Sequence, residues 1–112
     1  MARADISVQL IDRSGLEPSY TAATADGEKF VNNGRVFIHV KNGDASQHTV
    51  TVQTPGTVDG LDVAERTVDI PAGEERIIGP FPPGHYNQAD GKVYIDYDAV
   101  TSITLAAIRL GL

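Results

Sequence analysis

The chain has 112 residues, of which 41% are hydrophobic and 21% charged, and its formal net charge is −6. This composition is typical of one globular domain over residues 1–112, and its acidity argues against nucleic-acid binding, which needs clustered Lys and Arg. With no cysteine, the chain offers no disulfide, thiol nucleophile or zinc–thiolate site. It has no run of 18 apolar residues and no apolar leader core, so we expect no membrane partner and no signal peptide.

Eight short strands are predicted along the chain, because alternating or apolar runs are separated by Gly and Pro turn signals such as Asp26-Gly27 and Asn33-Gly34. The alternation is clearest in the third run, where every second residue from Val36 to Val40 is apolar. The final run contains Leu-Ala-Ala-Ile and could form a helix, but its Thr-Ser-Ile-Thr opening favours a strand. The predicted strands are 4–11, 28–31, 35–41, 47–54, 63–70, 75–79, 92–97 and 101–110.

These elements predict an all-β fold, a single antiparallel β-sandwich or a jelly-roll-like domain. No segment shows the helical i, i+3, i+4, i+7 period over three turns, so the crossover helices of a parallel sheet are missing. The segment 12–27 shows no strand pattern, and a loop that long inside a compact domain is often functional.

Three histidines, His39, His48 and His85, are the first candidates for a metal site. The residues before His48 superficially resemble a cupredoxin, but blue copper needs a Cys ligand, which this chain lacks. A three-histidine zinc site stays geometrically open, although histidines with satisfied ring nitrogens are the more common finding. We therefore expect no metal or cofactor.

Carboxylates offer a second possibility, since Asp96 and Asp98 share one face of a predicted strand. Facing carboxylates can hydrolyse glycosides or hold calcium. Neither activity has a motif here, and the loops 59–62 and 87–91 are the best places for a calcium ion. The simpler interpretation is a solvated strand face with Asx turns.

Motifs for the common enzyme classes are absent. The sequence has no Gly-x-Ser-x-Gly elbow, no phosphate-binding loop with its Lys, and no dinucleotide fingerprint. We therefore expect a protein that is not an enzyme. A carbohydrate-binding sandwich is an alternative, in which Tyr20, Tyr86 and Tyr94 would form the sugar face in a chain without Trp.

The succession of features along almost the whole chain resembles small proteins encoded in the head-gene clusters of tailed bacteriophages. Pieces such as Val68-Asp69-Ile70-Pro71-Ala72-Gly73 are common in β proteins, and the order of the pieces carries the resemblance. The further pieces are Gly15–Tyr20 with Ala22-Ala23, Gly27–Arg35, His39–Gly43, Thr49–Val52, Ile78–Phe81 and Val100–Ala107.

This resemblance implies a virion structural component, a decoration or cement protein on the capsid surface, assembled in the host cytoplasm. Its partner would be the lattice of the major capsid protein, with self-contact as a homotrimer or in another form. A head–tail connector or a minor tail protein fits the resemblance almost as well. From the residues themselves, Leu16, Pro18 and Tyr20 in the loop 12–27 are the predicted partner-binding residues, with Leu16 and Tyr20 as anchors. The alternative is that Tyr20 closes one end of the sandwich.

Overall fold

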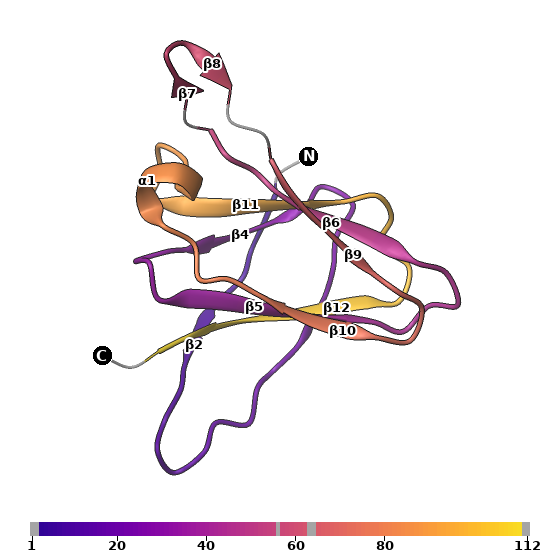
Figure 1. Ribbon diagram of the computed structural model, residues 1–112. Helices are drawn as coiled ribbons and strands as arrows, with labels where there is room; N and C mark the ends of the chain where they lie inside the picture. Colours follow the sequence, from indigo (N-terminus) through magenta and orange to yellow (C-terminus); the bar gives the residue numbers. More distant parts are fainter. Residues whose placement is uncertain (1–2, 56, 63–64, 111–112) are drawn as a thin grey trace.

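The computed structural model describes residues 3–55, 57–62 and 65–110, and it consists of two β-sheets packed against each other (Figure 1). The predicted all-β sandwich is therefore confirmed. Sheet A has the strand order β1 (Ala4–Asp5), β4 (Glu28–Val31), β11 (Lys92–Tyr97), β6 (His48–Val52) and β9 (Arg66–Ile70). Sheet B has the order β10 (Glu75–Ile78), β5 (Val36–Asn42), β12 (Ile103–Arg109) and β2 (Val8–Leu10), and β3 (Thr21–Ala22) also pairs with β12.

The N-terminal segment departs from the prediction in two ways. The predicted strand 4–11 is split, because the chain leaves sheet A after β1, crosses at Ile6 and Ser7, and joins sheet B as β2. Both pieces pair in parallel, β1 with β4 and β2 with β12, so the sheets are mixed and not purely antiparallel. At the crossing the Ile6 amide donates to the Lys29 carbonyl at 2.9 Å, and its side chain packs against the core.

The core forms where the alternating faces of the two sheets meet. On β5 the apolar face seen in the sequence, from Val36 to Val40, is fully buried. On β12, Leu105 and Ala107 belong to the core, while Ala106 and Ile108 on the other face are also buried. A strand covered on both faces reads as a continuous apolar run, which explains why this strand looked partly helical in the sequence.

Two small elements were not predicted. The segments β7 (Thr57–Val58) and β8 (Leu61–Asp62) form a hairpin that projects from the sandwich (Figure 1). Its turn residues Asp59 and Gly60 both have positive φ, 52° and 77°, as the type I′ turn of a two-residue hairpin requires. The single turn α1 (Pro83–Tyr86) follows β10, and no helix in the described ranges is long and apolar enough to cross a membrane.

The remaining predicted strands lie where expected, with small changes at their ends. The predicted strand 47–54 ends at Val52, and the strand predicted for 63–70 begins at Arg66, its first two positions being outside the described residues. The predicted loop 12–27 contains the two-residue strand β3, which pairs with Thr104 and Leu105 of β12.

Candidate functional site

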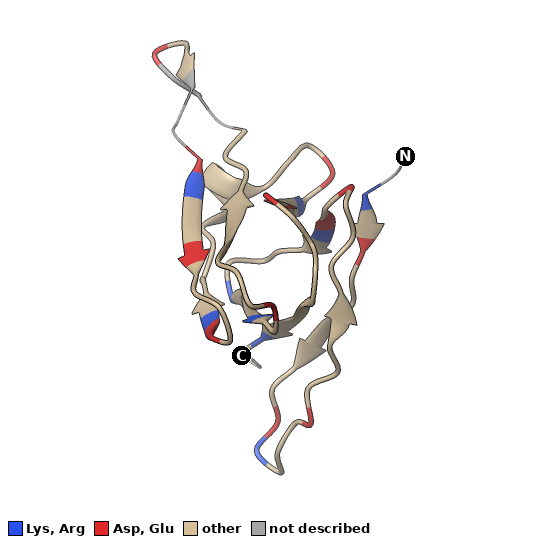
Figure 2. Ribbon diagram, turned by 90° about the vertical axis from the view of Figure 1, so that its right-hand side faces the viewer, with Lys and Arg blue, Asp and Glu red and all other residues tan. Residues whose placement is uncertain are grey.

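The segment between β2 and β3, residues 11–20, projects away from the sandwich, and we call it the arm. Figures 1 and 2 show it at the end of the molecule opposite the β7–β8 hairpin. All three predicted binding residues lie in it, and Leu16, Pro18 and Tyr20 are each half-buried.

The tip of the arm is a hydrogen-bonded turn. The Gly15 amide donates to the Asp12 carbonyl at 3.0 Å, and Gly15 has a φ of 101°, which glycine adopts without strain. The Asp12 carboxylate accepts hydrogen bonds from the Ser14 amide and hydroxyl, both at 2.8 Å. These bonds lower the pKa of Asp12, the amide contributing most. The charged end of the arm, which includes Arg13, therefore has a defined shape.

The base of the arm is closed by one side chain. The Gln9 amide group donates to the Ser19 carbonyl at 2.8 Å and accepts from the Ser19 amide at 2.9 Å. A glutamine that satisfies both backbone groups of a residue ten positions later replaces a missing pair of strand hydrogen bonds. The two legs of the arm are thereby held together where they leave sheet B.

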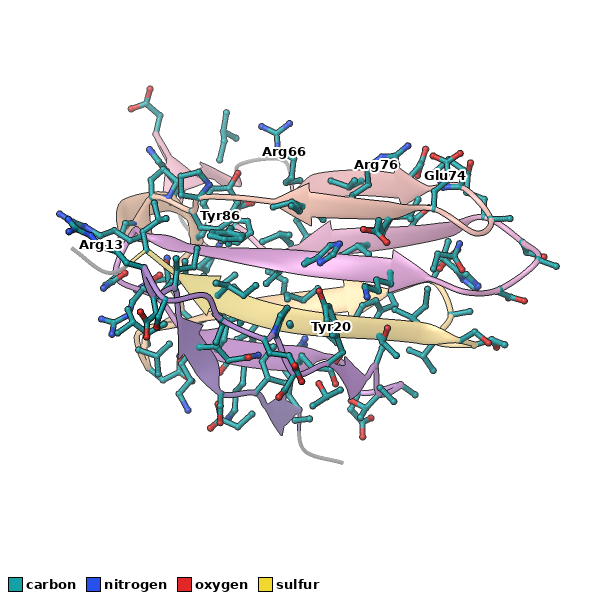
Figure 3. All side chains as sticks on the ribbon, turned by 90° about the horizontal axis from the view of Figure 1, so that it is seen from below. Arg13, Tyr20, Arg66, Glu74, Arg76 and Tyr86 are labelled. Atoms are coloured by element: carbon teal, nitrogen blue, oxygen red, sulfur yellow. The ribbon has the colours of Figure 1, made fainter. Side chains whose placement is uncertain are left out.

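Tyr20 fixes the returning leg to the outer face of sheet B. Its hydroxyl lies 2.6 Å from Nδ1 of His39 on β5, and the Lys41 Nζ lies 4.0 Å from its ring centroid. The other ring nitrogen of His39 lies 2.9 Å from the Glu75 carboxylate on β10. Figure 3 shows Tyr20 over the middle of the sheet and Arg13 toward one end. Tyr20 thus supports the arm from the sheet, while Leu16 and Pro18 lie in its projecting part.

Exposed apolar side chains gather beside the start of the arm. The strand pair β2–β12 brings Leu10 opposite Arg109, the Ile11 amide donates to the Arg109 carbonyl at 2.9 Å, and Leu110 follows directly. Arg109 also lines a cleft of about 200 Å³ together with Val31, which is exposed like the others. We call this edge of the molecule the apolar end; it carries the exposed Leu10, Ile11, Val31 and Leu110 and a cleft lined by Val8, Val31, Asn33, Val36 and Arg109.

The three histidines occupy separate places. His39 is on the outer face of sheet B, His85 is exposed on α1, and His48 is buried at an end of β6. His48 lies between two carboxylates, with Nε2 2.8 Å from Asp44 and Nδ1 3.2 Å from Asp98. The hydrogen bond to Asp44 is the largest cause that raises the pKa of His48. Within the described ranges, no group of three or more His, Asp or Glu is arranged to hold a metal ion.

The predicted acidic pair is separated by its partners. Asp96 accepts hydrogen bonds from Arg3 and Gln53, both at 2.6 Å, while Asp98 faces His48. In the loop 87–91, Asp90 accepts from the Lys92 amide and the Tyr94 hydroxyl. In the loop 59–62, the Asp62 side chain lies outside the described part of the structure.

The three tyrosines of the predicted sugar face do not converge. Tyr20 lies on the outer face of sheet B, and Tyr94 lies on β11 of sheet A, where Arg3 covers its ring at 4.7 Å. Tyr86 packs edge-on against Phe81, with ring centroids 5.3 Å apart. An open groove of about 650 Å³ passes Tyr86, His85 and Arg66, and neither of the other two tyrosines lines it.

The sequence did not reveal the supports of the arm. Gln9 lies within the predicted strand 4–11 with no motif around it, and His39 gave no sign that it would face Tyr20, 19 positions earlier. Neither contact leaves a local sequence signal, because each depends on which strands become neighbours.

Comparison with known proteins gives no relative of this chain: no family model, no curated protein and no solved structure matches it.

Proposed function

We propose that this protein is a non-enzymatic virion protein that binds the assembled head of a tailed bacteriophage, as a capsid decoration or cement protein. The observation that carries the proposal is the supported arm beside an exposed apolar end. A segment that is already held at its tip, base and returning leg loses little conformational freedom on docking. Such a preorganised segment is suited to binding the surface of another protein.

The partner in this proposal is the lattice of the major capsid protein. Leu16 and Pro18 of the arm, with the apolar end, supply apolar surface for the centre of a contact, and Asp12, Arg13 and Glu17 supply a charged rim. If the contact forms only with the assembled lattice, binding stabilises the assembled state by mass action. Copies on the particle would contact one another, as a trimer or in another arrangement.

The test is binding of purified protein to heads and to tails of the phage that encodes it. Leu16→Ala should weaken binding to heads about 30-fold, which corresponds to about 2 kcal/mol for a buried anchor, and leave the melting temperature unchanged. Leu61→Ala is the matched control, because Leu61 is 72% exposed on the hairpin at the opposite end of the molecule.

The other outcomes of this binding test would favour a different function or a different contact surface. Binding to tails and not to heads would replace the decoration role with a connector or tail role. Binding to neither particle, together with retention on a polysaccharide column, would favour a carbohydrate-binding module. Equal effects of the two leucine substitutions on head binding would remove the arm from the proposed contact.

A further inference from the structure

Among the edge strands of the two sheets, β10 carries the most exposed large apolar side chain. The sheet ends are β1 and β9 in sheet A, and β2 and β10 in sheet B. The strands β1 and β2 have two and three residues, and β9 carries no exposed large apolar side chain in the described residues. On β10, Ile77 is 67% exposed. An exposed edge with an apolar residue is a template for pairing with another strand.

The pairing of β10 with β5 determines which backbone N–H and C=O groups of β10 point toward solvent. Glu74 is opposite Asn42, because Glu75 pairs with Lys41, and the Asn42 amide donates to the Glu74 carbonyl at 2.9 Å. Hydrogen-bonded and non-hydrogen-bonded pairs alternate along antiparallel strands. The backbone groups of Glu75 and Ile77 therefore point away from β5, toward any strand added at this edge.

The charged side chains of β10 are paired within one chain. The Glu75 carboxylate lies 2.9 Å from Nε2 of His39, the residue directly opposite Ile77. Arg76 contacts Glu74 at 3.0 Å and donates to the outward-pointing Glu75 carbonyl at 2.8 Å, a bond that an added strand would replace. Ile77 is therefore the edge position that combines an outward-pointing backbone with an exposed apolar side chain.

We propose that β10 pairs with β10 of a second copy, in antiparallel orientation about a two-fold axis at Ile77. Three two-fold registers can place outward-pointing backbone groups opposite each other. An axis at Glu75 sets Glu75 against Glu75, and an axis at Arg76 sets Arg76 against Arg76; like charges directly opposite each other destabilise a sheet. The axis at Ile77 sets Ile77 against Ile77, Arg76 against Ile78 and Glu75 against Gly79.

This contact joins sheet B of both copies into one continuous sheet and covers the exposed isoleucine. It is isologous, so it forms closed pairs and no trimer by itself. It follows from the chain alone and does not depend on the proposed capsid role.

The absence of cysteine allows a direct test by cross-linking. In the proposed register the Cα atoms of the two Ile77 residues are about 5.5 Å apart, within the range of a disulfide. Ile77→Cys should therefore give a disulfide-linked dimer within minutes of mild oxidation. Glu75→Cys on the same strand should cross-link at least ten times more slowly, because its partner position is Gly79. Leu61→Cys measures the rate of collision between exposed cysteines.

Sedimentation of the unmodified chain provides the second readout. We expect a concentration-dependent dimer that Ile77→Lys converts to a monomer, while the melting temperature at low concentration stays the same. An unmodified chain that stays monomeric at millimolar concentration overturns the proposal. Cross-linking of Ile77→Cys at the rate of Leu61→Cys, or slower than Glu75→Cys, overturns it as well.

Discussion

The buried imidazole of His48 predicts that the stability of this protein falls at alkaline pH. Its two ring nitrogens face two carboxylates, Asp44 in the β5–β6 connection and Asp98 after β11. The hydrogen bond to Asp44 raises the pKa of His48 above its ordinary value of 6.5, and the same bond lowers the pKa of Asp44. Because the folded state holds the proton more tightly than the unfolded state, its stabilisation is complete below about pH 6.5 and is lost as the pH rises through the pKa of folded His48.

The size of the loss in stability follows from the number of N–H donors on the imidazole ring of His48. Protonated imidazole donates from both nitrogens, whereas the neutral ring has one N–H and can satisfy only one carboxylate. A hydrogen bond to a charged group contributes about 1.5–3 kcal/mol. Both carboxylates are partly exposed to solvent, at 26% for Asp44 and 47% for Asp98, so we expect the lower end, about 1.5 kcal/mol. For a domain of this size that corresponds to roughly 6 °C in melting temperature.

The assay compares urea unfolding of the unmodified protein and of His48→Gln from pH 5.5 to 9.5. The glutamine variant cannot carry the charge, so the gap in unfolding free energy between the two proteins should shrink by about 1.5 kcal/mol from pH 6 to pH 9. The control is His85→Gln, because His85 is exposed on α1, and its gap should stay near zero. A His48→Gln gap that is constant across this range, or that widens toward pH 9, would refute the reasoning.

Two further substitutions test other polar contacts. Asn42→Asp replaces a buried amide that donates to two backbone carbonyls at 2.9 Å with a carboxylate that cannot donate. Urea unfolding should show a loss of about 3 kcal/mol, whereas the exposed control Asn33→Asp keeps its acceptor and should change little; equal losses would contradict this account. Tyr20→Phe removes the hydroxyl that meets a histidine ring nitrogen at 2.6 Å, so trypsin should cleave at Arg13 several-fold faster. The control Tyr94→Phe loses a hydrogen bond on the other sheet and should leave that cleavage unchanged; if it speeds cleavage as much, Tyr20 does not hold the arm.

The sequence predicted those strands whose side chains alternate against the core. The strands 28–31 and 92–97 have the predicted bounds, because one face of each is buried and alternation records burial directly. The hairpin β7–β8 has two residues on each side, too few for a period, although Asp59-Gly60 was recognisable as a turn pair. The parallel pairing of β1 with β4 and of β2 with β12 was missed, because each pair joins segments far apart in the chain. The local pattern of a strand carries no information about which strand it will pair with.

The candidate site was predicted less completely than the fold. The missing strand pattern directed attention to the segment that holds Leu16, Pro18 and Tyr20, because a chain with little to bury shows no period, and the structure shows that this segment projects from the sandwich (Figure 1). Absence of a pattern gives no geometry, however. The tip turn was visible in principle, since Asp, Ser and Gly at positions 12, 14 and 15 favour it. The contact between Gln9 and Ser19 could be found only from the structure.

The arm and β10 lie on opposite sides of β5 and β12 in sheet B, and a chain of hydrogen bonds connects them. The Tyr20 hydroxyl meets one ring nitrogen of His39, and Glu75 on β10 meets the other. His39 lies on β5, between the leg of the arm and the strand that carries Ile77. A surface gripped by the arm and a second copy paired along β10 would therefore not compete for the same residues. Both contacts lie on one sheet, so two copies paired at Ile77 would present two arms in a fixed relative orientation, as the proposed bridging of lattice subunits would require.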